Sequence, residues 1–561
     1  MTNERVTIDG QEVLVPAGST VLEAARLAGI KISTLCDHPS IEPIGACRMC
    51  LVEIEKQRVL QPACTFPVSE GMVIHTNTER VKESRRFVLQ LLFSERNHFC
   101  MFCQMSGSCE LQTLAYENGL DHWEFDRAFS KFSVDASRKY FVMDHNRCIL
   151  CRRCIRACDE LVGNGTLGLK NRGANTIIIA DLDVPFGESS CVSCGTCLQI
   201  CPTGALMDRA SAYMGAKNEI TRVKSRCLAC SVGCGVELVV RDNRVIRVEG
   251  DWEAMPNKGL LCEIGRFHPL HEERHRLRKP LVRRDGVLVE TSWEEALQAV
   301  AQGLKAAGQD VCTVASGFVT NEEAAALQAL PGAKVLMGAS PVNAEGACLS
   351  VLDEADLYIM VNTDLAKDHQ VAGFAIKRSV RHRGARLVIL SDQPTKMDDW
   401  AIARWTLAEA DRAIRLAAEA QMPAILYTPE GVTLAETLAA QLPRAKRVPL
   451  APLGNALGLA KAGFAGFDGQ KAAAYVVVAG EAPAMPEPLA GALEKAAFVV
   501  AQARYRAPWD QVADVLLPMP TTFEKSGTMV NTEGHEYALS AAVKVTLPNA
   551  QQMAAQLGSL L

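Results

Sequence analysis

The pattern of hydrophobic and polar positions predicts a strand pair and two helices at the start of the chain. Residues 6–15 (VTIDGQEVLV) alternate apolar and polar side chains around Asp9-Gly10, which predicts two strands joined by a tight turn. Residues 19–29 (STVLEAARLAG) carry apolar side chains at helical intervals, so we expect a helix with Ser19 as its N-cap and Glu23 near the capping-box position. Residues 80–95 (RVKESRRFVLQLLFSE) predict a longer second helix.

Short, continuous apolar runs dominate the second half of the chain. They are AKVLMG (333–338), DLYIMVN (356–362), RLVILSD (386–392), PAILYT (423–428), AYVVVAG (474–480) and AFVVAQ (497–502). Helical patterns such as residues 293–307 (WEEALQAVAQGLKAA) and 433–442 (TLAETLAAQL) alternate with them. Buried strands that alternate with helices predict α/β layers built on parallel sheets.

Cysteine is concentrated in the first half of the chain. Of the 21 cysteines, 19 lie between Cys36 and Cys262, and only Cys312 and Cys348 follow. The first residues, MTNERVTIDG, lack the apolar core of an export signal, so we expect reduced thiolates that hold metal in the cytoplasm rather than disulfides. Cys312 and Cys348 are expected to be small buried apolar residues.

Two cysteine runs with identical spacing form the centre of this region. They read Cys148-x2-Cys151-x2-Cys154-x3-Cys158 and Cys191-x2-Cys194-x2-Cys197-x3-Cys201-Pro202. This is the two-cluster ferredoxin signature, in which the fourth cysteine of each run crosses to the other cluster. We therefore assign Cys148, Cys151, Cys154 and Cys201 to one [4Fe–4S] cluster, and Cys191, Cys194, Cys197 and Cys158 to its neighbour. Zinc sites are the alternative, although zinc ribbons use two separated pairs around one ion.

A further set near the N-terminus consists of Cys36, Cys47, Cys50 and Cys64. Four thiolates on a strand-and-loop scaffold suit a [2Fe–2S] cluster. Their spacing of x10, x2 and x13 resembles the N-terminal ferredoxin domain of the large iron–sulfur subunit of respiratory complex I, the G subunit of NADH dehydrogenase. Related hydrogenase and formate dehydrogenase subunits share that domain.

The resemblance implies a histidine-ligated [4Fe–4S] cluster after the second helix. Its ligands would be His98, Cys100, Cys103 and Cys109. One residue separates the histidine from the first cysteine here, where complex I subunits have three, and this short loop resembles the diaphorase subunit of soluble NAD-linked nickel–iron hydrogenases. Because a neutral imidazole replaces a thiolate, this cluster is expected to be easier to reduce than an all-cysteine cluster.

A fifth set, Cys227-x2-Cys230-x3-Cys234-x27-Cys262, resembles the N-terminal [4Fe–4S] domain of molybdopterin oxidoreductases. Residues 258–267, 293–297 and 523–534 extend that resemblance to the C-terminal half. A zinc site is the alternative for this set, since it has one tight pair. We expect the C-terminal half to be a degenerate domain without pterin, because the ligand motif of active members is missing. Cys348 is its nearest candidate ligand.

The fold class expected is α+β iron–sulfur domains followed by an α/β domain. The domains expected are 1–80 (β-grasp [2Fe–2S] ferredoxin), 81–140 (helical segment whose [4Fe–4S] cluster has one histidine and three cysteine ligands), 141–220 (two-cluster [4Fe–4S] ferredoxin), 221–270 (molybdopterin-oxidoreductase-type [4Fe–4S] domain) and 271–561 (degenerate molybdopterin-oxidoreductase-like domain). No phosphate-binding glycine motif lies between a strand and a helix, so no nicotinamide or flavin site is expected in this chain.

Composition narrows the function to a relay of electrons. A net charge of −5 does not favour nucleic-acid binding, no run of eighteen apolar residues predicts a membrane span, and residues 377–386 are expected to be solvated surface. The resemblance implies three partners: a flavoprotein that binds FMN and NAD(H), a small thioredoxin-like [2Fe–2S] subunit, and a terminal module. We expect a soluble hydrogenase-linked or formate-linked complex, bifurcating ones included. Alternatives are the membrane complex I subunit, a catalytic molybdopterin formate dehydrogenase, and a zinc-dependent interaction protein.

Overall fold

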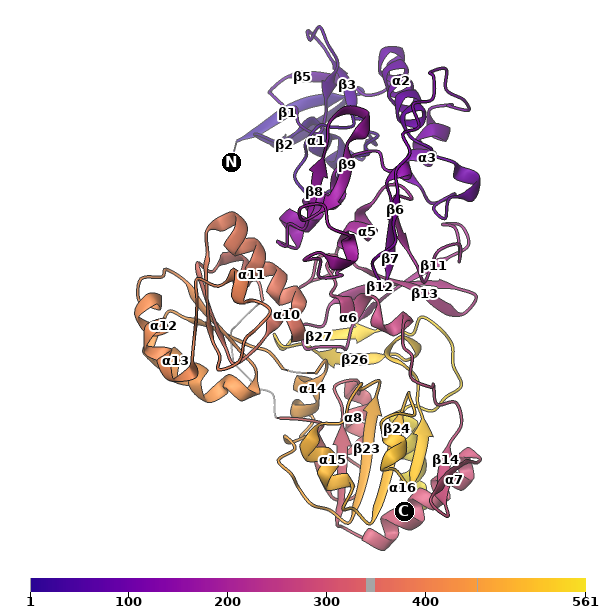
Figure 1. The fold of residues 1–561 in the computed structure, drawn as a ribbon, viewed down its shortest axis with the longest axis vertical. Helices are drawn as coiled ribbons and strands as arrows, with labels where there is room; N and C mark the ends of the chain where they lie inside the picture. The colour runs from indigo at the N-terminus through magenta and orange to yellow at the C-terminus, as the bar shows by residue number, and fades with distance from the viewer. Residues whose placement is uncertain (1, 340–348, 452) are drawn as a thin grey trace. The chain divides into compact units, whose positions relative to one another are not determined.

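The computed structural model describes residues 2–339, 349–451 and 453–561. The chain forms two compact units, Met1–Ile220 and Thr221–Leu561, each described by itself below (Figure 1).

Unit 1 begins with a five-stranded sheet in the order β2-β1-β5-β3-β4. Its strands are β1 (Asn3–Ile8), β2 (Gln11–Pro16), β3 (Leu51–Ile54), β4 (Gln61–Pro62) and β5 (Met72–His75). Asp9 and Gly10 form the turn of the first hairpin, both with positive φ, which matches the twist of the paired strands. Helix α1 (Val21–Leu27) buries Val21, Leu22 and Ala25 in the core of this sheet.

The rest of unit 1 consists of short elements around the cysteine loops. The helices are α2 (Glu79–Glu95), α3 (Glu110–Glu117), α4 (Arg153–Arg156) and α5 (Thr196–Ile200), and one 3-10 turn, η1 (Cys100–Phe102), lies in the histidine loop. The strands are β6 (Val134–Asp135), β7 (Phe141–Asp144), β8 (Leu167–Lys170), β9 (Ile177–Ala180) and β10 (Leu206–Asp208). Because most of these elements are short, the loops rather than a large sheet position the cysteines.

Unit 2 begins with an antiparallel sheet of β11 (Thr221–Arg226), β12 (Gly235–Arg241) and β13 (Arg244–Gly250), followed by α6 (Glu263–Arg266). A seven-stranded sheet then has the order β15-β14-β25-β24-β23-β16-β17. These strands are β14 (Leu281–Arg284), β15 (Val287–Glu290), β16 (Val311–Ala315), β17 (Ala333–Leu336), β23 (Ala474–Gly480), β24 (Phe498–Ala503) and β25 (Val515–Pro518). Its helices are α7 (Trp293–Ala307), α8 (Asn321–Leu327), α14 (Ala456–Lys461), α15 (Glu487–Leu493) and α16 (Ala550–Leu560).

A second, fully parallel sheet in unit 2 has the order β20-β19-β18-β21-β22. Its strands are β18 (Leu357–Val361), β19 (Arg386–Leu390), β20 (Ala403–Trp405), β21 (Pro423–Tyr427) and β22 (Lys446–Pro449), with helices α9 (Val351–Glu354), α10 (Leu365–Asp368), α11 (Gln370–Arg383), α12 (Ala410–Ala417) and α13 (Val432–Gln441). Alternate residues of β18 pack with α11 on one face and with α12 and α13 on the other. A hairpin of β26 (Gly527–Val530) and β27 (Glu536–Leu539) completes the unit.

The α/β prediction for the second half is confirmed, since the six apolar runs form strands of two sheets covered by helices on both faces. The N-cap prediction was wrong by one residue. Thr20, not Ser19, caps α1, because a capping box needs the carboxylate three positions further on, at Glu23. Cys312 is buried in β16 as expected, and Cys348 lies outside the described residues.

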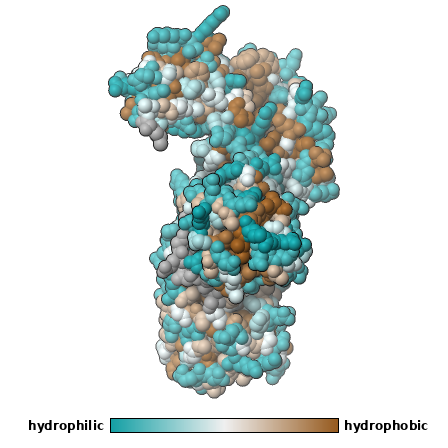
Figure 2. Space-filling model, turned by 90° about the vertical axis from the view of Figure 1, so that its left-hand side faces the viewer, coloured by the Kyte–Doolittle hydropathy of each residue, from teal (hydrophilic) through white to brown (hydrophobic). Residues whose placement is uncertain are grey.

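The prediction of a solvated surface at residues 377–386 was wrong in part. Arg381 to Gly384 are exposed, but Lys377 is buried, with its ammonium group 5.1 Å from the ring centre of Trp400. Among the described residues, no helix is both long and apolar enough to cross a membrane. Figure 2 shows hydrophilic side chains over much of one face, with hydrophobic residues gathered in patches.

Candidate iron–sulfur sites

The four N-terminal cysteines lie together beside the first sheet. The backbone N–H groups of Cys36 and Cys47 each donate to the other's Sγ, at 3.3 and 3.4 Å. Hydrogen bonds from Cys47 and Cys64 lower the pKa of Cys36 to about 2, whereas the same contacts raise the pKa of Cys47 and of Cys64. Thiols that share protons in this way form a donor set that suits a cationic iron centre.

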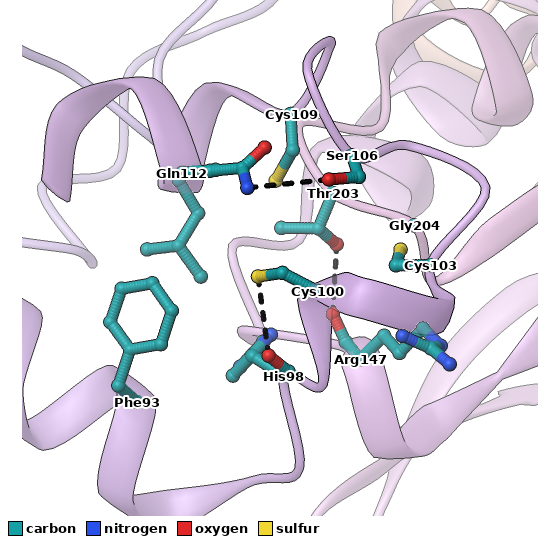
Figure 3. A pocket seen from close by; sticks show the side chains of 11 residues that line it. Phe93, His98, Cys100, Cys103, Ser106, Cys109, Gln112, Arg147, Thr203 and Gly204 are labelled. Carbon is teal, nitrogen blue, oxygen red and sulfur yellow. Dashed lines mark hydrogen bonds between the residues drawn. The ribbon is translucent and has the colours of Figure 1, made fainter. Parts of the chain in front are cut away.

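His98 and three cysteines line one cavity in unit 1 (Figure 3). The cavity encloses about 320 Å³ between atoms, part of it open to solvent, and Phe93, Leu111 and Gly204 form further parts of its wall. The cysteines lining it are Cys100 and Cys103 in the loop at η1 and Cys109 immediately before α3.

The imidazole of His98 is arranged like a metal ligand. Its Nε2 atom is buried without a hydrogen-bond partner, while the ring also bonds the backbone of Leu92. Burial, together with Arg147 and Arg96, lowers the pKa of His98 to about 4, so the ring is neutral at pH 7. A neutral imidazole whose other nitrogen bonds the backbone is the usual form of a ligating histidine.

The two identical cysteine runs adopt the same backbone conformation. In the first, Leu150 and Arg152 have φ of 54° and 60°, and in the second Ser193 and Gly195 have φ of 52° and 69°. Leu150 N and Ser193 N each donate to the Sγ of the cysteine two residues earlier, at 3.4 Å. Left-handed residues other than glycine are strained, and such strain gathers at ligand clamps.

Cys158 lines a cavity with three cysteines of the other run, as the crossed assignment expects. The cavity encloses about 340 Å³ between atoms and is lined by Cys158, Cys191, Cys194 and Cys197. The remaining set also lies together, because the charges of Cys151, Cys148 and Cys201 add to burial in raising the pKa of Cys154.

Burial makes these thiols poor acids when nothing compensates their charge. It raises the pKa of Cys109 to about 12, that of Cys148 to about 11 and that of Cys158 to about 12. Iron binds the thiolate form, so cluster binding would supply the compensating positive charge. All twenty described cysteines are free, and no three His, Cys, Asp or Glu side chains among the described residues converge as on a single metal ion.

Three of the sets in unit 1 meet in one apolar cluster. Buried Cys36 and Cys151, with half-buried Cys47, Cys100 and Cys109, belong to a single hydrophobic cluster. It also contains Leu35, Met49, Leu89, Phe93, Leu111, Leu114 and Ile149. The charge of Cys197 also contributes to the raised pKa of Cys154. The set of Cys148, Cys151, Cys154 and Cys201 thus neighbours each of the other three.

Unit 2 brings the fifth set together beside β12 and α6. Cys227 N donates to the Cys234 carbonyl at 2.9 Å, and Gly265 N donates to Cys262 Sγ at 3.3 Å. A methyl group on Gly265 would lie 3.3 Å from Cys227 Sγ and 3.7 Å from Cys262 Sγ, which places both sulfurs beside this glycine. Burial raises the pKa of all four thiols, that of Cys227 to about 12.

The seven-stranded sheet offers the described residues no open crevice for a pterin where β16 and β23 end. Open α/β sheets bind ligands at the carboxyl ends of strands where the strand order reverses, which here is between these two strands. A methyl group on Gly480 would lie 2.6 Å from Phe318 Cβ, and one on Gly317 would lie 2.3 Å from Leu453 Cβ. The chain's own side chains fill this position and do not fit a pterin.

Three residues that the cysteine spacing does not reveal support these sites. Arg153 and Arg156 flank Cys154 on α4 and are 3% and 7% exposed. Gly204 approaches Cys103 so closely that an added Cβ would lie 2.5 Å from Cys103 Sγ. The only signal in the sequence was the pair of arginines on either side of a predicted ligand.

Five family models match the chain in succession. They are described as 2Fe-2S iron-sulfur cluster binding domain (residues 3–79), NADH-ubiquinone oxidoreductase-G iron-sulfur binding region (85–123), NADH-quinone oxidoreductase subunit 3, ferredoxin-like domain (139–207), molybdopterin oxidoreductase Fe4S4 domain (220–273) and molybdopterin oxidoreductase (276–419). Together with the fold, they define an iron–sulfur protein that carries ferredoxin-type domains and a molybdopterin-oxidoreductase-like domain.

The curated relatives identify the family within this class. NADH-quinone oxidoreductase subunit 3 of Thermus thermophilus is 28% identical over 96% of this chain and 80% of its own length. The second G subunit of NADH-quinone oxidoreductase from Rhizobium meliloti is 33% identical over 70% of this chain, and NADPH-Fe(3+) oxidoreductase subunit alpha of Geobacter sulfurreducens is 30% identical over 71%. The chain spans about half the length of these last two, 48% and 49%.

A solved structure, an NAD+-reducing [NiFe]-hydrogenase in the H2-reduced state, is 36% identical over 38% of this chain and 90% of its own, with a TM-score of 0.36. The chain belongs to the family of large iron–sulfur subunits of NADH-quinone oxidoreductase, which are named as its G subunit or as subunit 3.

Proposed function

We propose that this chain is an iron–sulfur electron-relay subunit of a multi-subunit NAD(P)H-linked oxidoreductase. The observation that carries the proposal is the apolar cluster that contains cysteines from three predicted cluster sites. Iron–sulfur clusters supply one-electron transfer, at potentials set by their ligands, burial and hydrogen bonds to sulfur. The chain's own residues hold neighbouring sites in water-poor surroundings at fixed separations.

The proposed cofactors are one [2Fe–2S] and four [4Fe–4S] clusters. The ligand sets are Cys36, Cys47, Cys50 and Cys64; His98, Cys100, Cys103 and Cys109; Cys148, Cys151, Cys154 and Cys201; Cys191, Cys194, Cys197 and Cys158; and Cys227, Cys230, Cys234 and Cys262. We propose domain boundaries after residues 80, 140, 220 and 270. No residue of the chain is assigned a covalent or acid–base role.

The partners belong to the same proposal. A flavoprotein that binds FMN and NAD(H), a small [2Fe–2S] subunit and a terminal hydrogenase-type or formate-type module would complete the complex, on the cytoplasmic side because free thiols need a reducing compartment. The names of the Thermus and Geobacter relatives refer to NADH and NADPH. A large subunit of membrane complex I is the second candidate, since most matched names are of quinone reductases. Copurification of membrane-embedded subunits with the native complex would favour it.

The first test is elemental analysis of anaerobically purified protein for iron, sulfide, zinc, molybdenum and tungsten. The relay requires about 18 iron atoms per chain, the content of one [2Fe–2S] and four [4Fe–4S] clusters. A Cys103→Ala variant should contain about four iron atoms fewer, and Cys312→Ala, which alters a buried cysteine of β16, should lose none. Several zinc ions with little iron would contradict the proposal, and stoichiometric molybdenum or tungsten would make unit 2 a catalytic domain.

A further inference from the structure

Helix α4 lies where three of the proposed clusters meet, and its two buried arginines contact the other two sites. Arg153 and Arg156 lie on either side of Cys154, one of the proposed ligands. Both side chains are more than nine-tenths buried, and the Nε atom of each has no hydrogen-bond partner. Burying a guanidinium group is costly unless something negative compensates it.

Arg156 holds the loop of the proposed [2Fe–2S] site against α4. Its Nη2 donates to the carbonyl of Cys36 and its Nη1 to the carbonyl of Glu42. Glu160, one turn further along the same helical segment, accepts a hydrogen bond from Glu42 N at 2.8 Å. The contacts join the backbone of one proposed ligand, Cys36, to the helix that carries another, Cys154.

Arg153 makes the corresponding contact with the histidine-ligated site. Its Nη1 and Nη2 donate to the two carboxylate oxygens of Glu110, at 2.7 and 2.9 Å. Glu110 directly follows Cys109, and its backbone N donates to Pro202 O at 2.9 Å, next to Cys201. A paired, fork-like contact of this kind fixes geometry more strongly than a single hydrogen bond.

We propose that Arg153 and Arg156 are positioning residues that set the spacing of the three clusters meeting at α4, and that the charge of Arg156 raises the reduction potential of the [2Fe–2S] cluster. This inference rests on the proposed function. A cluster with four thiolate ligands carries net negative charge, which compensates the buried guanidinium. In turn, the guanidinium stabilises the reduced, more negative form of the cluster.

The test measures potentials and magnetic coupling rather than turnover. Full-length Arg156→Gln, Arg156→Lys and Arg153→Gln are purified anaerobically, with Arg152→Gln as the control, since Arg152 is the exposed neighbour with the same charge. Iron and sulfide analysis of the wild type tests the proposed function separately. Redox-poised EPR then gives each midpoint potential and the spin coupling between neighbouring clusters.

We expect Arg156→Gln to make reduction of the [2Fe–2S] cluster at least about tenfold less favourable, which is about 59 mV for one electron. Arg156→Lys should keep that potential but weaken the coupling of [2Fe–2S] to the Cys154 cluster, because one ammonium group cannot bond both carbonyls in the same geometry. Arg153→Gln should weaken only the coupling of the histidine-ligated cluster.

Wild-type coupling in both Arg156→Lys and Arg153→Gln, or equal loss of both couplings in each of them, would overturn the positioning role. A potential in Arg156→Gln equal to that of Arg152→Gln would overturn the charge effect. Should Arg156→Gln lose its cluster, the coupling in Arg156→Lys decides.

Discussion

The Nε2 atom of His98 is buried beside three cysteines without a hydrogen-bond partner, and few side chains of unit 1 show so directly what their surroundings lack. The ring is neutral because burial lowers its pKa to about 4. Cys100, Cys103 and Cys109 would each bring a negative charge to a shared cluster, whereas His98 brings none. This difference should be visible in the reduction potential.

Replacing His98 with cysteine should lower the potential of this cluster, because the new thiolate adds one negative charge to both oxidation states and disfavours the reduced one. Potentiometric titration followed by EPR measures the change. His122→Cys, at an exposed histidine of the same unit, is the control and should leave all potentials unchanged. An unchanged potential in a fully loaded His98→Cys protein would contradict ligation by His98.

Gly204 tests the same site from its opposite wall. A Cβ there would lie 2.5 Å from Cys103 Sγ, so Gly204→Ala should displace that sulfur and cost the protein about four iron atoms, the content of one [4Fe–4S] cluster. Gly168→Ala in β8 is the matched control, since an added Cβ there meets nothing within 4 Å. Full iron content in Gly204→Ala would show that the loop of Cys103 adapts freely.

Single elements follow local rules where their ends are concerned. Helix α1 begins at a capping box in which Thr20 Oγ1 accepts from Glu23 N at 3.2 Å and Thr20 N donates to Glu23 Oε2 at 2.7 Å. Ser19 is the same type of residue one position earlier, but it is four residues from Glu23 and cannot form this box. The choice between adjacent hydroxyl residues therefore depends on backbone geometry, which the sequence pattern leaves open by one residue.

Thr20→Ala should destabilise the start of α1 by about 1 kcal/mol, the usual cost of losing an N-cap. Hydrogen exchange of the α1 amides in the holoprotein measures the effect, which should appear as faster exchange. Ser19→Ala should change the exchange rates little. Equal acceleration in both variants would return the capping role to Ser19.

Across unit 2, one ion pair joins parts of the chain that are far apart in sequence. Lys525 Nζ lies 2.6 Å from Glu323 Oε2, with both side chains almost fully buried, and it also donates to the Phe318 carbonyl at 2.8 Å. The pair lies where β16 and the segment after β25 come together, beside the position that Phe318 fills. It helps to explain why this edge of the sheet is closed.

Lys525→Met should destabilise unit 2 by about 3–5 kcal/mol, because it leaves the Glu323 carboxylate buried without its partner. Hydrogen exchange in β23 and β24 during urea titration measures the loss. The double variant Lys525→Met/Glu323→Gln should recover a large part of it, and Lys279→Met, which removes an exposed ion pair with Glu290, should have little effect. Equal losses in the single and double variants would contradict this account.

Local spacing was enough to predict the strand and helix types of unit 2, the strand pair at Asp9-Gly10, and which cysteines form sets, because periodicity and short loops act over a few residues. The ligand sets themselves stay predictions. Folding decided which sets become neighbours: Arg156 reaches the Cys36 carbonyl across 120 residues, and Arg153 reaches Glu110 across 43. Such contacts depend on how separate loops pack around one apolar cluster, and no local pattern encodes them.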